Sequence, residues 1–471
     1  MATTPMRNPQ RSAHFSAERS RILSLPETDR DLVRLAQRDD FSRVVEQLRA
    51  TGGCEHPIYL AGGSLTRDSA TGVVLRSYST HGEPGGVLAV RCRNRRRTRC
   101  EPCSRLHQGD TYQLVRAGLE GGKETPETVA GHPRLFVTLT APSFGAVHRA
   151  ADGERCRPHR DGNCPHGYPR RCGMRHTDTD SMNGTPLCRY CYDYTAHALW
   201  HAHAGILWDR TTRNIRRAIA TELGITQTEF RRHLKLSFSK VAEYQGRGAI
   251  HFHAVFRLDG PDGAHSSPHS AANSGVLENA IRKAVESAST VTPYSPAGEH
   301  EIYWGTQLDI RTVRESEGKE SLTAGTISGY ISKYISKGVT DSTTDYPIKS
   351  PDQIERRRVS PHIRTLMRTC WRLGGLPELA HLRLRAWAHT LGFRGHCLSK
   401  SRAYSTTYKA LRTARAAHRG ALTAPQDGTT EERAWRYVHA GHTPGTALLA
   451  TGIADQTRAH IELRREGLGD D

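Results

Sequence analysis

The stretch from Val241 to Phe256 constrains the fold of this chain more than any other segment. It reads Val-Ala-Glu-Tyr-Gln-Gly-Arg-Gly-Ala-Ile-His-Phe-His-Ala-Val-Phe. Two runs rich in β-branched and aromatic residues flank a short glycine-rich turn, and this pattern is typical of a β-hairpin. We expect strands at 234–244 and 249–258, joined by the loop Gly-Arg-Gly. In that register Glu243 lies opposite His251.

This hairpin predicts a metal site, because residues two apart in a strand face the same side. His251 and His253 therefore point to one place, and Glu243 joins them from the neighbouring strand. Two imidazoles and a carboxylate suit Mg²⁺ or Mn²⁺ acting on a substrate oxygen, or Zn²⁺. The alternative is a pair of histidines on a solvated strand face, since the chain contains 26 His. A second pair, His201 and His203, falls in a helical pattern that turns the imidazoles apart, so we assign it no role.

A second candidate group falls in a helix expected at 324–338. The spacing i, i+3, i+4 and i+7 forms one helical stripe that carries Tyr330, Lys333, Tyr334 and Lys337. Nearby ammonium groups can stabilise a phenolate or hold a phosphate. The alternative is an ordinary amphipathic helix with aromatic and snorkelling lysine side chains. A third element, Phe136-Val-Thr-Leu-Thr-Ala-Pro142, is by composition only a core strand.

Taken in order, these three motifs resemble the signature of HUH endonucleases: Phe-x-Thr-Leu-Thr-x-Pro, then His-hydrophobic-His, then Tyr-x-x-Lys. More narrowly, the chain is similar to the rolling-circle replication initiators (Rep proteins) of Streptomyces-type plasmids and integrative elements. The resemblance spans roughly Gly85 to Lys400. It implies an α+β fold with an HUH-type central antiparallel sheet, flanking helices, zinc-stabilised Cys-rich insertions and a helical C-terminal region.

The resemblance also implies an activity, which is metal-dependent, site- and strand-specific DNA nicking and rejoining. A tyrosine would form a 5′-phosphotyrosyl bond and free a 3′-OH primer, with Mg²⁺ or Mn²⁺ held by Glu243, His251 and His253. Single-tyrosine relatives carry an acidic residue where the first tyrosine stands, so Tyr334 is expected to attack first and Tyr330 second. The implied partners are double-strand origin DNA, cleaved as a single strand, with host helicase and polymerase.

The charge of the chain supports a polyanionic partner. It has 67 Lys plus Arg against 48 Asp plus Glu, a formal net charge of +19, and only ten of the basic residues are Lys. GC-rich codon usage would explain the excess of Arg over Lys but not the net charge. The best candidates for phosphate contacts are six arginines in one run: Arg91, Arg93, Arg95, Arg96, Arg97 and Arg99. The alternative is that this run is a solvated basic loop. Without a long apolar run or an apolar leader, we expect a cytoplasmic protein with no membrane partner.

The chain has eleven cysteines, an odd number, and we expect it not to be exported, so metal binding is favoured over disulfides. Two Cys-x-x-Cys pairs are expected to share one structural Zn²⁺: Cys100, Cys103, Cys188 and Cys191. A possible second zinc site draws on Cys156, His159, Cys164, His166, Cys172 and His176. Free thiols are the alternative, and they are most plausible for Cys54, Cys370 and Cys397.

The expected organisation has four parts. They are an N-terminal arm, helix and small β segment at 1–84, a nicking domain at 85–338 with a Cys-rich zinc-binding region at 92–191, a linker at 339–360, and a basic helical region at 361–471 that could bind DNA. Two alternatives stay open, a two-tyrosine HUH transposase and a non-catalytic, zinc-stabilised DNA-binding regulator. An attached helicase is not expected, because the chain has no Walker-type loop.

Overall fold

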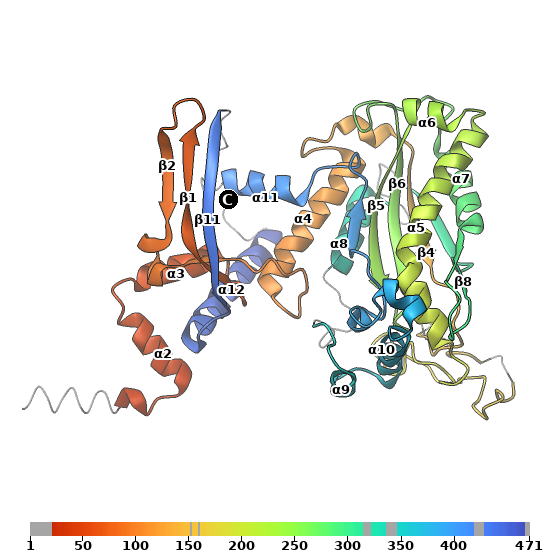
Figure 1. Cartoon of the computed structure of the whole chain (residues 1–471), viewed down its shortest axis with the longest axis horizontal. Helices are drawn as coiled ribbons and strands as arrows, with labels where there is room; N and C mark the ends of the chain where they lie inside the picture. The colour runs from red at the N-terminus through yellow and green to blue at the C-terminus, as the bar shows by residue number, and fades with distance from the viewer. Residues whose placement is uncertain are drawn as a thin grey trace, which may run out of the picture. The chain divides into compact units, whose positions relative to one another are not determined.

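The computed structural model describes residues 21–150, 153–158, 161–313, 322–335, 346–418 and 428–466 (Figure 1). The chain divides into two compact units. The central unit is formed by Gln108–Ala414, and the terminal unit by Met1–His107 together with Arg415–Asp471. Helix α4 (Glu101–Glu120) contributes residues to both.

A five-stranded antiparallel sheet forms the middle of the central unit. Its strand order is β10-β5-β6-β4-β9. The strands are β4 (Arg134–Thr140), β5 (Lys235–Tyr244), β6 (Ile250–Asp259), β9 (Leu308–Thr312) and β10 (Leu398–Lys400). The two strands of the expected hairpin, β5 and β6, therefore lie next to each other, with β6 at the centre.

The hairpin has the register that the sequence predicts. Glu243 pairs with His251 across the two strands. The turn is closed by Gln245 N–H, which donates to the Ala249 carbonyl at 2.8 Å. Gly248 adopts a φ of +76°, and an added Cβ there would lie 2.8 Å from Ile363 Cδ1. The turn thus needs glycine both for its backbone conformation and for the close approach of a neighbouring side chain.

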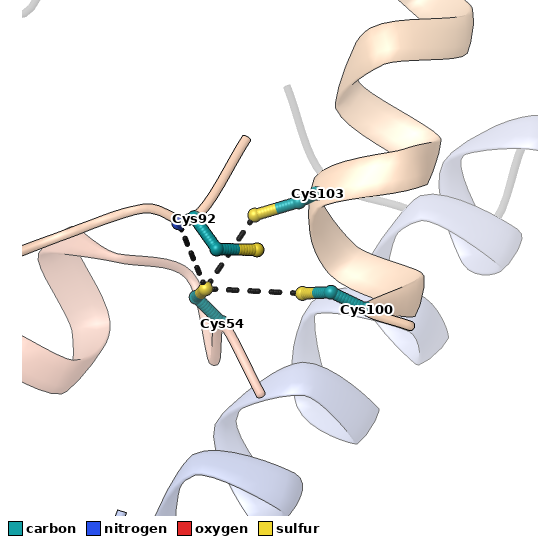
Figure 2. A group of neighbouring side chains, drawn as sticks. All are labelled: Cys54, Cys92, Cys100 and Cys103. Atoms are coloured by element: carbon teal, nitrogen blue, oxygen red, sulfur yellow. Dashed lines mark hydrogen bonds between the residues drawn. The ribbon is translucent and has the colours of Figure 1, made fainter. Parts of the chain in front are cut away.

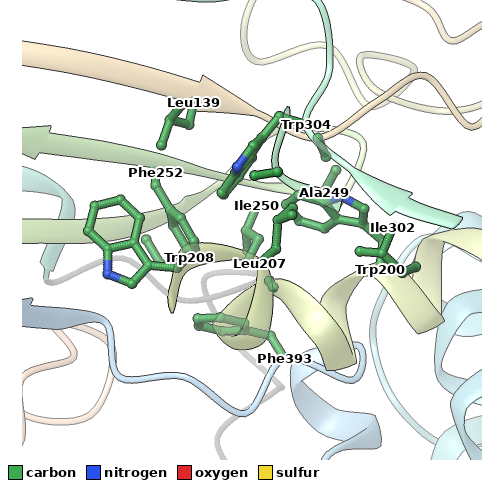
Figure 3. Packing of buried hydrophobic residues seen from close by; sticks show 14 of the residues in the cluster. Leu139, Trp200, Leu207, Trp208, Ala249, Ile250, Phe252, Ile302, Trp304 and Phe393 are labelled. Atoms are coloured by element: carbon green, nitrogen blue, oxygen red, sulfur yellow. The ribbon is translucent and has the colours of Figure 1, made fainter. Parts of the chain in front are cut away.

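One face of the sheet is covered by helices α5 (Tyr194–Glu222), α6 (Gln227–His233) and α7 (Ser274–Ser287). Here Trp208 of α5 stacks on Phe256 of β6 at a ring-centroid distance of 5.5 Å. Trp208 also meets Phe252 edge-on at 5.8 Å (Figure 3). Helix α10 (Pro361–Leu373) packs against α5. Large aromatic side chains fill the space between sheet and helices, and this buried contact is the main core of the unit.

The opposite face of the sheet packs against helix α8 (Ala324–Ile335) and the second half of α4. Val241 and Val255 of the hairpin meet Ile327 and Ile331 of α8 there. Side chains alternate along a strand, so the face of β6 that carries Val255 also carries the two histidines of the expected metal site. Helix α8, which bears the tyrosines, therefore lies over the histidine face of the sheet.

A buried ion pair at the C-terminal end of β6 links the sheet to neighbouring segments of the central unit. Arg257 and Asp259 are both fully buried on β6, and their side chains pair at 2.6 and 3.0 Å. His132 Nδ1 lies 2.7 Å from Asp259, and Ser237 donates its hydroxyl to the same carboxylate at 2.6 Å. Arg257 also donates to the Tyr404 carbonyl at 3.1 Å. Every oxygen of the buried carboxylate has partners, as a buried charge requires.

Several smaller elements complete the central unit. They are β7 (Ser289–Val291), β8 (Glu301–Tyr303), α9 (Pro351–Glu355) and α11 (Tyr408–His418), which ends in the terminal unit. Between β8 and β9 the chain leaves the strand conformation at Trp304, which is buried and donates its indole N–H to Thr211 at 2.8 Å. Of the expected linker, residues 346–360 are described, and they include α9.

The terminal unit contains a second antiparallel sheet. Along one edge of β1 (Ile58–Asp68) lie β2 (Val74–Ser79) and β3 (Leu88–Val90), and along the other lies β11 (Thr429–Ala440). Three helices accompany the sheet, namely α2 (Glu27–Ala36), α3 (Phe41–Ala50) and α12 (Pro444–Arg465). Helix α12 packs on α2 and α3, and Gly445 N–H donates to Asp31 at 2.7 Å.

The expectation of an α+β fold with antiparallel sheets and flanking helices is confirmed. The region 361–471, which was expected to be mostly helical, contains helices α10, α11 and α12 but also two strands, since β10 joins the central sheet and β11 the terminal one. Strand β11 is exposed along nearly its whole length and so lacks the hydrophobic alternation that marks a strand. Within the described ranges, no helix is long and apolar enough to cross a membrane.

Candidate active site and metal centres

The three residues of the expected metal site converge on one point. Glu243 Oε2 lies 3.0 Å from Nε2 of His251 and 3.0 Å from Nε2 of His253, and the two nitrogens are 3.1 Å apart. Two donors that each lie about 2.1 Å from one ion are about 3 Å apart when they meet it near a right angle. The spacing of the donor atoms therefore fits a single divalent cation.

The electrostatics of this group favour a cation. Burial raises the pKa of Glu243, but hydrogen bonds and charge from His251 and His253 outweigh it, so the pKa lies below its ordinary value. Burial lowers the pKa of His253, partly opposed by its hydrogen bond to Glu243. The group thus holds an ionised carboxylate beside an imidazole that resists protonation, and both are ready to donate electron pairs to a metal.

The orientation of His253 is fixed from strand β4, a contribution that sequence reasoning missed. Thr138 Oγ1 lies 3.0 Å from Nδ1 of His253, the ring nitrogen on the far side from Glu243. Phe136 lies parallel to the same imidazole at a centroid distance of 5.9 Å. Phe136 and Thr138 both lie on the face of β4 that the two histidines share in the neighbouring strand. The alternation of side chains along β4 was the available signal that they face the site. Such partners of a ligating histidine set its tautomer and its direction.

Helix α8 brings its two phenols to the same place. The hydroxyl of Tyr330 lies 3.2 Å from His253 Nε2, and the rings of Tyr330 and Tyr334 are 4.6 Å apart. The ring of Tyr334 stacks near His253 at 6.1 Å. Burial and the negative charge of Glu243 raise the pKa of both phenols. Lys333 is exposed on this helix, and Lys337 lies outside the described residues.

Four cysteines of the terminal unit form a buried cluster: Cys54, Cys92, Cys100 and Cys103 (Figure 2). Cys54 Sγ lies 3.8 Å from Cys100 Sγ and 3.5 Å from Cys103 Sγ. Four sulfurs bound at about 2.3 Å around one tetrahedral Zn²⁺ lie about 3.8 Å apart, whereas a disulfide needs about 2.05 Å. Backbone N–H groups point at the sulfurs, for example Cys92 N–H at Cys54 Sγ (3.3 Å). The cluster has the geometry of a Cys₄ zinc site.

Two further clusters lie in the Cys-rich part of the central unit. The first is formed by His148, Cys156, Cys172 and His176. His176 Nε2 lies 3.2 Å from His148 Nδ1 and 3.4 Å from Cys172 Sγ. The other nitrogen of His176 meets Asp180 at 2.7 Å, and this contact fixes the ring in the way that second partners of zinc-bound histidines do. These donors suit a Cys₂His₂ zinc site.

The third cluster is formed by Cys164, His166, Cys188 and Cys191. His166 Nδ1 lies 3.3 Å from Cys191 Sγ and 3.8 Å from Cys188 Sγ. Backbone N–H···O bonds hold the surrounding loop, including those from Cys164 N–H to the Tyr168 carbonyl at 2.8 Å and from Gly167 N–H to the Cys164 carbonyl at 2.9 Å. Three thiols and one imidazole form a Cys₃His set, which is also typical of structural zinc.

These clusters correct the expected zinc sites. Cys100 and Cys103 do not share a site with Cys188 and Cys191, because each pair already has two other ligands of its own. The expected second site is likewise divided, since Cys156 and Cys172 belong to one cluster and Cys164 and His166 to another. His159 lies outside the described residues. A Cys-x-x-Cys pair supplies half of a tetrahedral site, and its spacing does not say where the other half comes from.

The cysteines that were most plausible as free thiols behave differently from one another. Cys54 belongs to the Cys₄ cluster, so that expectation is wrong for it. Cys370 lies in the core, where burial raises its pKa to about 12, and Cys397 faces the Ala242 carbonyl at 3.7 Å. Neither belongs to a metal-ligand group among the described residues. His148 was missed because it precedes the Cys-rich stretch.

The arginine run falls between two ligands of the Cys₄ cluster. Cys92 and Cys100 bracket residues 93–99, and Arg91 lies directly before them. Arg93 and Arg97 are exposed. The other four members of the run are half-buried: Arg91, Arg95, Arg96 and Arg99. The run is therefore a short loop tied at both ends, not an open basic strand.

His201 and His203, to which the sequence assigned no role, are buried in helix α5. His201 Nε2 accepts from the Ile250 N–H at 3.1 Å, and its Nδ1 lies 2.8 Å from the Leu391 carbonyl. Burial lowers the pKa of His201 to about 4. This imidazole therefore stays neutral and serves as a structural link between helix α5 and the start of β6.

Comparison with known proteins identifies the family of the chain. The family described as replication initiator protein, pSAM2 (RepSA) matches residues 40–455. A replication initiator protein of Streptomyces ambofaciens is 41% identical over 460 aligned residues, which cover 94% of this chain and 96% of the relative. No solved structure matches the chain. The family match extends through both units, and the chain therefore belongs to the RepSA family of replication initiator proteins.

Proposed function

We propose that this replication initiator nicks one strand of plasmid or element origin DNA and rejoins it through the tyrosines of helix α8. The observation that carries the proposal is the 3.2 Å contact between the Tyr330 hydroxyl and His253 Nε2. The same nitrogen faces Glu243 and His251, so the phenol stands beside a three-donor metal site. A nucleophile next to a site for a divalent cation is the arrangement that phosphoryl transfer requires.

Glu243, His251 and His253 would hold Mg²⁺ or Mn²⁺. When bound, such an ion supplies positive charge that polarises the scissile phosphate. The phenol oxygen attacks phosphorus and loses its proton. The bond from phosphorus to the 3′ oxygen breaks, and that oxygen keeps the electron pair and takes up a proton. The products are a 5′-phosphotyrosyl bond and a free 3′-OH, which host polymerase extends behind a host helicase.

Two phenols in reach of one centre allow two transfers without release of the first covalent end. The resemblance to HUH endonucleases assigns the first cleavage to Tyr334 and the second to Tyr330. The contact of Tyr330 with His253 supports a direct role for that phenol, and the 4.6 Å separation of the rings places Tyr334 beside it. We propose that Tyr334 attacks first and Tyr330 second.

Family membership favours origin initiation over the alternative of a two-tyrosine transposase. A non-catalytic DNA-binding regulator would need the zinc clusters and the arginine run. It would have no use for a phenol held against the imidazole of a candidate metal ligand. Burial raises the pKa of this phenol, which is a cost that only a catalytic role explains.

The test begins by mapping the nick on supercoiled plasmid DNA. A suicide oligonucleotide spanning that nick is then incubated with protein and Mn²⁺, and the covalent adduct is measured. We expect Tyr334→Phe to lose the adduct, and Tyr330→Phe to keep it but fail in the second transfer. Loss of the adduct in Tyr330→Phe alone reverses the order. An adduct in the double variant would show that the nucleophile is not in α8.

A second test addresses the metal site. His251→Ala should abolish nicking but leave duplex binding nearly unchanged, because most binding energy comes from phosphate contacts elsewhere. His265→Ala, which removes an exposed loop histidine, is the matched control and should nick normally. Nicking by His251→Ala at the normal rate with Mg²⁺ or Mn²⁺ would contradict the proposed metal site.

A further inference from the structure

We propose that the terminal unit carries a second DNA-binding site, an arginine loop (residues 93–99) whose shape is held by a zinc ion bound to Cys54, Cys92, Cys100 and Cys103. This site belongs to the terminal unit, whereas the nicking centre belongs to the central unit, and its ligand is duplex DNA. The inference rests on the proposed function only for the identity of its ligand, which is DNA.

The chemistry of the cluster selects the metal. All four donors are thiols, and soft thiolates bind Zn²⁺ whereas Mg²⁺ and Mn²⁺ prefer oxygen donors. The Cys54 sulfur lies 3.8 and 3.5 Å from those of Cys100 and Cys103, close to the edge of a ZnS₄ tetrahedron. Cys54, Cys100 and Cys103 are almost completely buried, so the ion would be closed off from substrate. This zinc would therefore be structural.

The loop between the ligands is fixed at several points. Cys92 and Cys100 anchor its ends, and the Ser104 hydroxyl donates to the Arg95 carbonyl at 2.7 Å. Arg96 N–H donates to Asn94 Oδ1 at 2.9 Å. Arg93 has a φ of +55°, a left-handed conformation that a side-chain-bearing residue keeps only where its surroundings enforce it. These constraints hold the loop in one shape before DNA arrives.

The fixed loop concentrates positive charge. Residues 91–99 contain six arginines and no acidic residue, and Arg93 and Arg97 are exposed. The nearest carboxylate in sequence, Glu101, is engaged by Arg105. Guanidinium groups match phosphate oxygens with paired donors, and a preordered loop loses less conformational freedom on binding. A polyanion with regularly spaced phosphates is the ligand that fits this surface.

Zinc analysis of the full-length protein tests the metal. The three clusters with thiol ligands predict three zinc ions per chain. Cys92→Ser should lower the content to two, while Arg93→Gln/Arg97→Gln should keep three. Retention of three zinc ions by Cys92→Ser would overturn the site. The arginine variant separates the charge of the loop from the fold, because Cys92→Ser removes a residue of the cluster whereas Arg93→Gln/Arg97→Gln leaves the cluster intact.

Binding to a short origin duplex, measured against salt, tests the loop. Arg93→Gln/Arg97→Gln should weaken binding on the order of tenfold and reduce the slope of log K against log salt by about 1.8. Arg34→Gln/Arg43→Gln removes the same charge from exposed positions of α2 and α3 and is the matched control. Equal losses in both variants would overturn a specific role for the loop. Loss of single-strand binding alone would overturn the duplex assignment.

The outcome is distinguishable from failure of the nicking proposal. At saturating concentrations of the suicide oligonucleotide, the loop variant should form the covalent adduct as the wild type does. If the wild type forms no adduct but the loop variant still loses duplex binding, the nicking proposal fails and the loop stands. If adduct formation is normal and duplex binding is unchanged, the loop proposal fails alone.

Discussion

The contact between Thr138 and His253 gives the sharpest test of the metal site, because it can be removed without touching a ligand. Thr138→Val keeps the shape of the side chain and its preference for a strand but deletes the hydroxyl that lies 3.0 Å from His253 Nδ1. If Nε2 binds the metal, Nδ1 carries the proton and donates a hydrogen bond to Thr138 Oγ1. The variant would leave the Nδ1–H of the nearly fully buried His253 ring without a hydrogen-bond partner.

The magnitude follows from the loss of this partner. Mutation of groups that orient a ligating histidine typically lowers metal affinity 10- to 100-fold, or about 1.4 to 2.8 kcal/mol. We expect the Mn²⁺ concentration that gives half-maximal adduct formation to rise by this factor. The rate at saturating Mn²⁺ should recover, because ligands and nucleophiles are unchanged. Isothermal titration with Mn²⁺ should give the same factor in the dissociation constant.

The control lies two residues further along the same strand face. Thr140→Val also deletes a hydroxyl, but that hydroxyl donates to the Gln307 carbonyl at 2.8 Å and not to a ligand. It should cost about 1 kcal/mol of stability and leave Mn²⁺ affinity unchanged. Equal Mn²⁺ affinities for wild type and Thr138→Val would refute the reasoning, as would a loss that saturating metal does not rescue.

Two further predictions concern stability and zinc. Burial raises the pKa of Asp259, but hydrogen bonds from His132 and Arg257 outweigh it and lower the pKa, so the carboxylate stabilises the fold above the ordinary carboxyl range of about 3.9. Asp259→Asn should lower the free energy of unfolding by about 3 to 5 kcal/mol at pH 7, as measured by urea unfolding. The difference between wild type and variant should shrink as the pH falls through the lowered pKa of Asp259. A difference that does not change with pH would contradict this prediction. Cys100→Ser/Cys188→Ser should lose two zinc ions by elemental analysis, whereas a site shared by both pairs would lose only one.

The central hairpin and the convergence of its three candidate metal ligands could be predicted from the sequence, because both depend on local rules. Strand alternation and a three-residue turn fix which side chains meet, so the convergence of Glu243, His251 and His253 follows from their spacing alone. The position of α8 over this face did not follow from local rules, because the apolar stripe of Ile327 and Ile331 can pack on a sheet without specifying which face it covers. Thr138 escaped notice because strand alternation places it on one face of β4 but does not tell which side chain of the neighbouring strand it meets.

The zinc ligands and the terminal sheet could not be derived in this way. Cys54 and Cys92 complete a cluster with Cys100 and Cys103, but nothing in their spacing separates that choice from a partnership with the later pair. Strand β11 pairs with β1 from the other end of the chain, and its exposed, mixed composition hides it. Both features are long-range, and their partners are decided by how distant segments meet in space.

The pairing of β1 with β11 has a consequence for how the protein is made. A ribosome that adds about 5 to 20 residues per second finishes β1 roughly 20 to 70 seconds before it finishes β11. During that interval one edge of β1 has no strand to pair with, although β2 and β3 already cover the other. The terminal sheet can close only on a chain translated almost to its end. Synthesis that stops early would yield a polypeptide with an open strand edge, which is a substrate for chaperones and proteases.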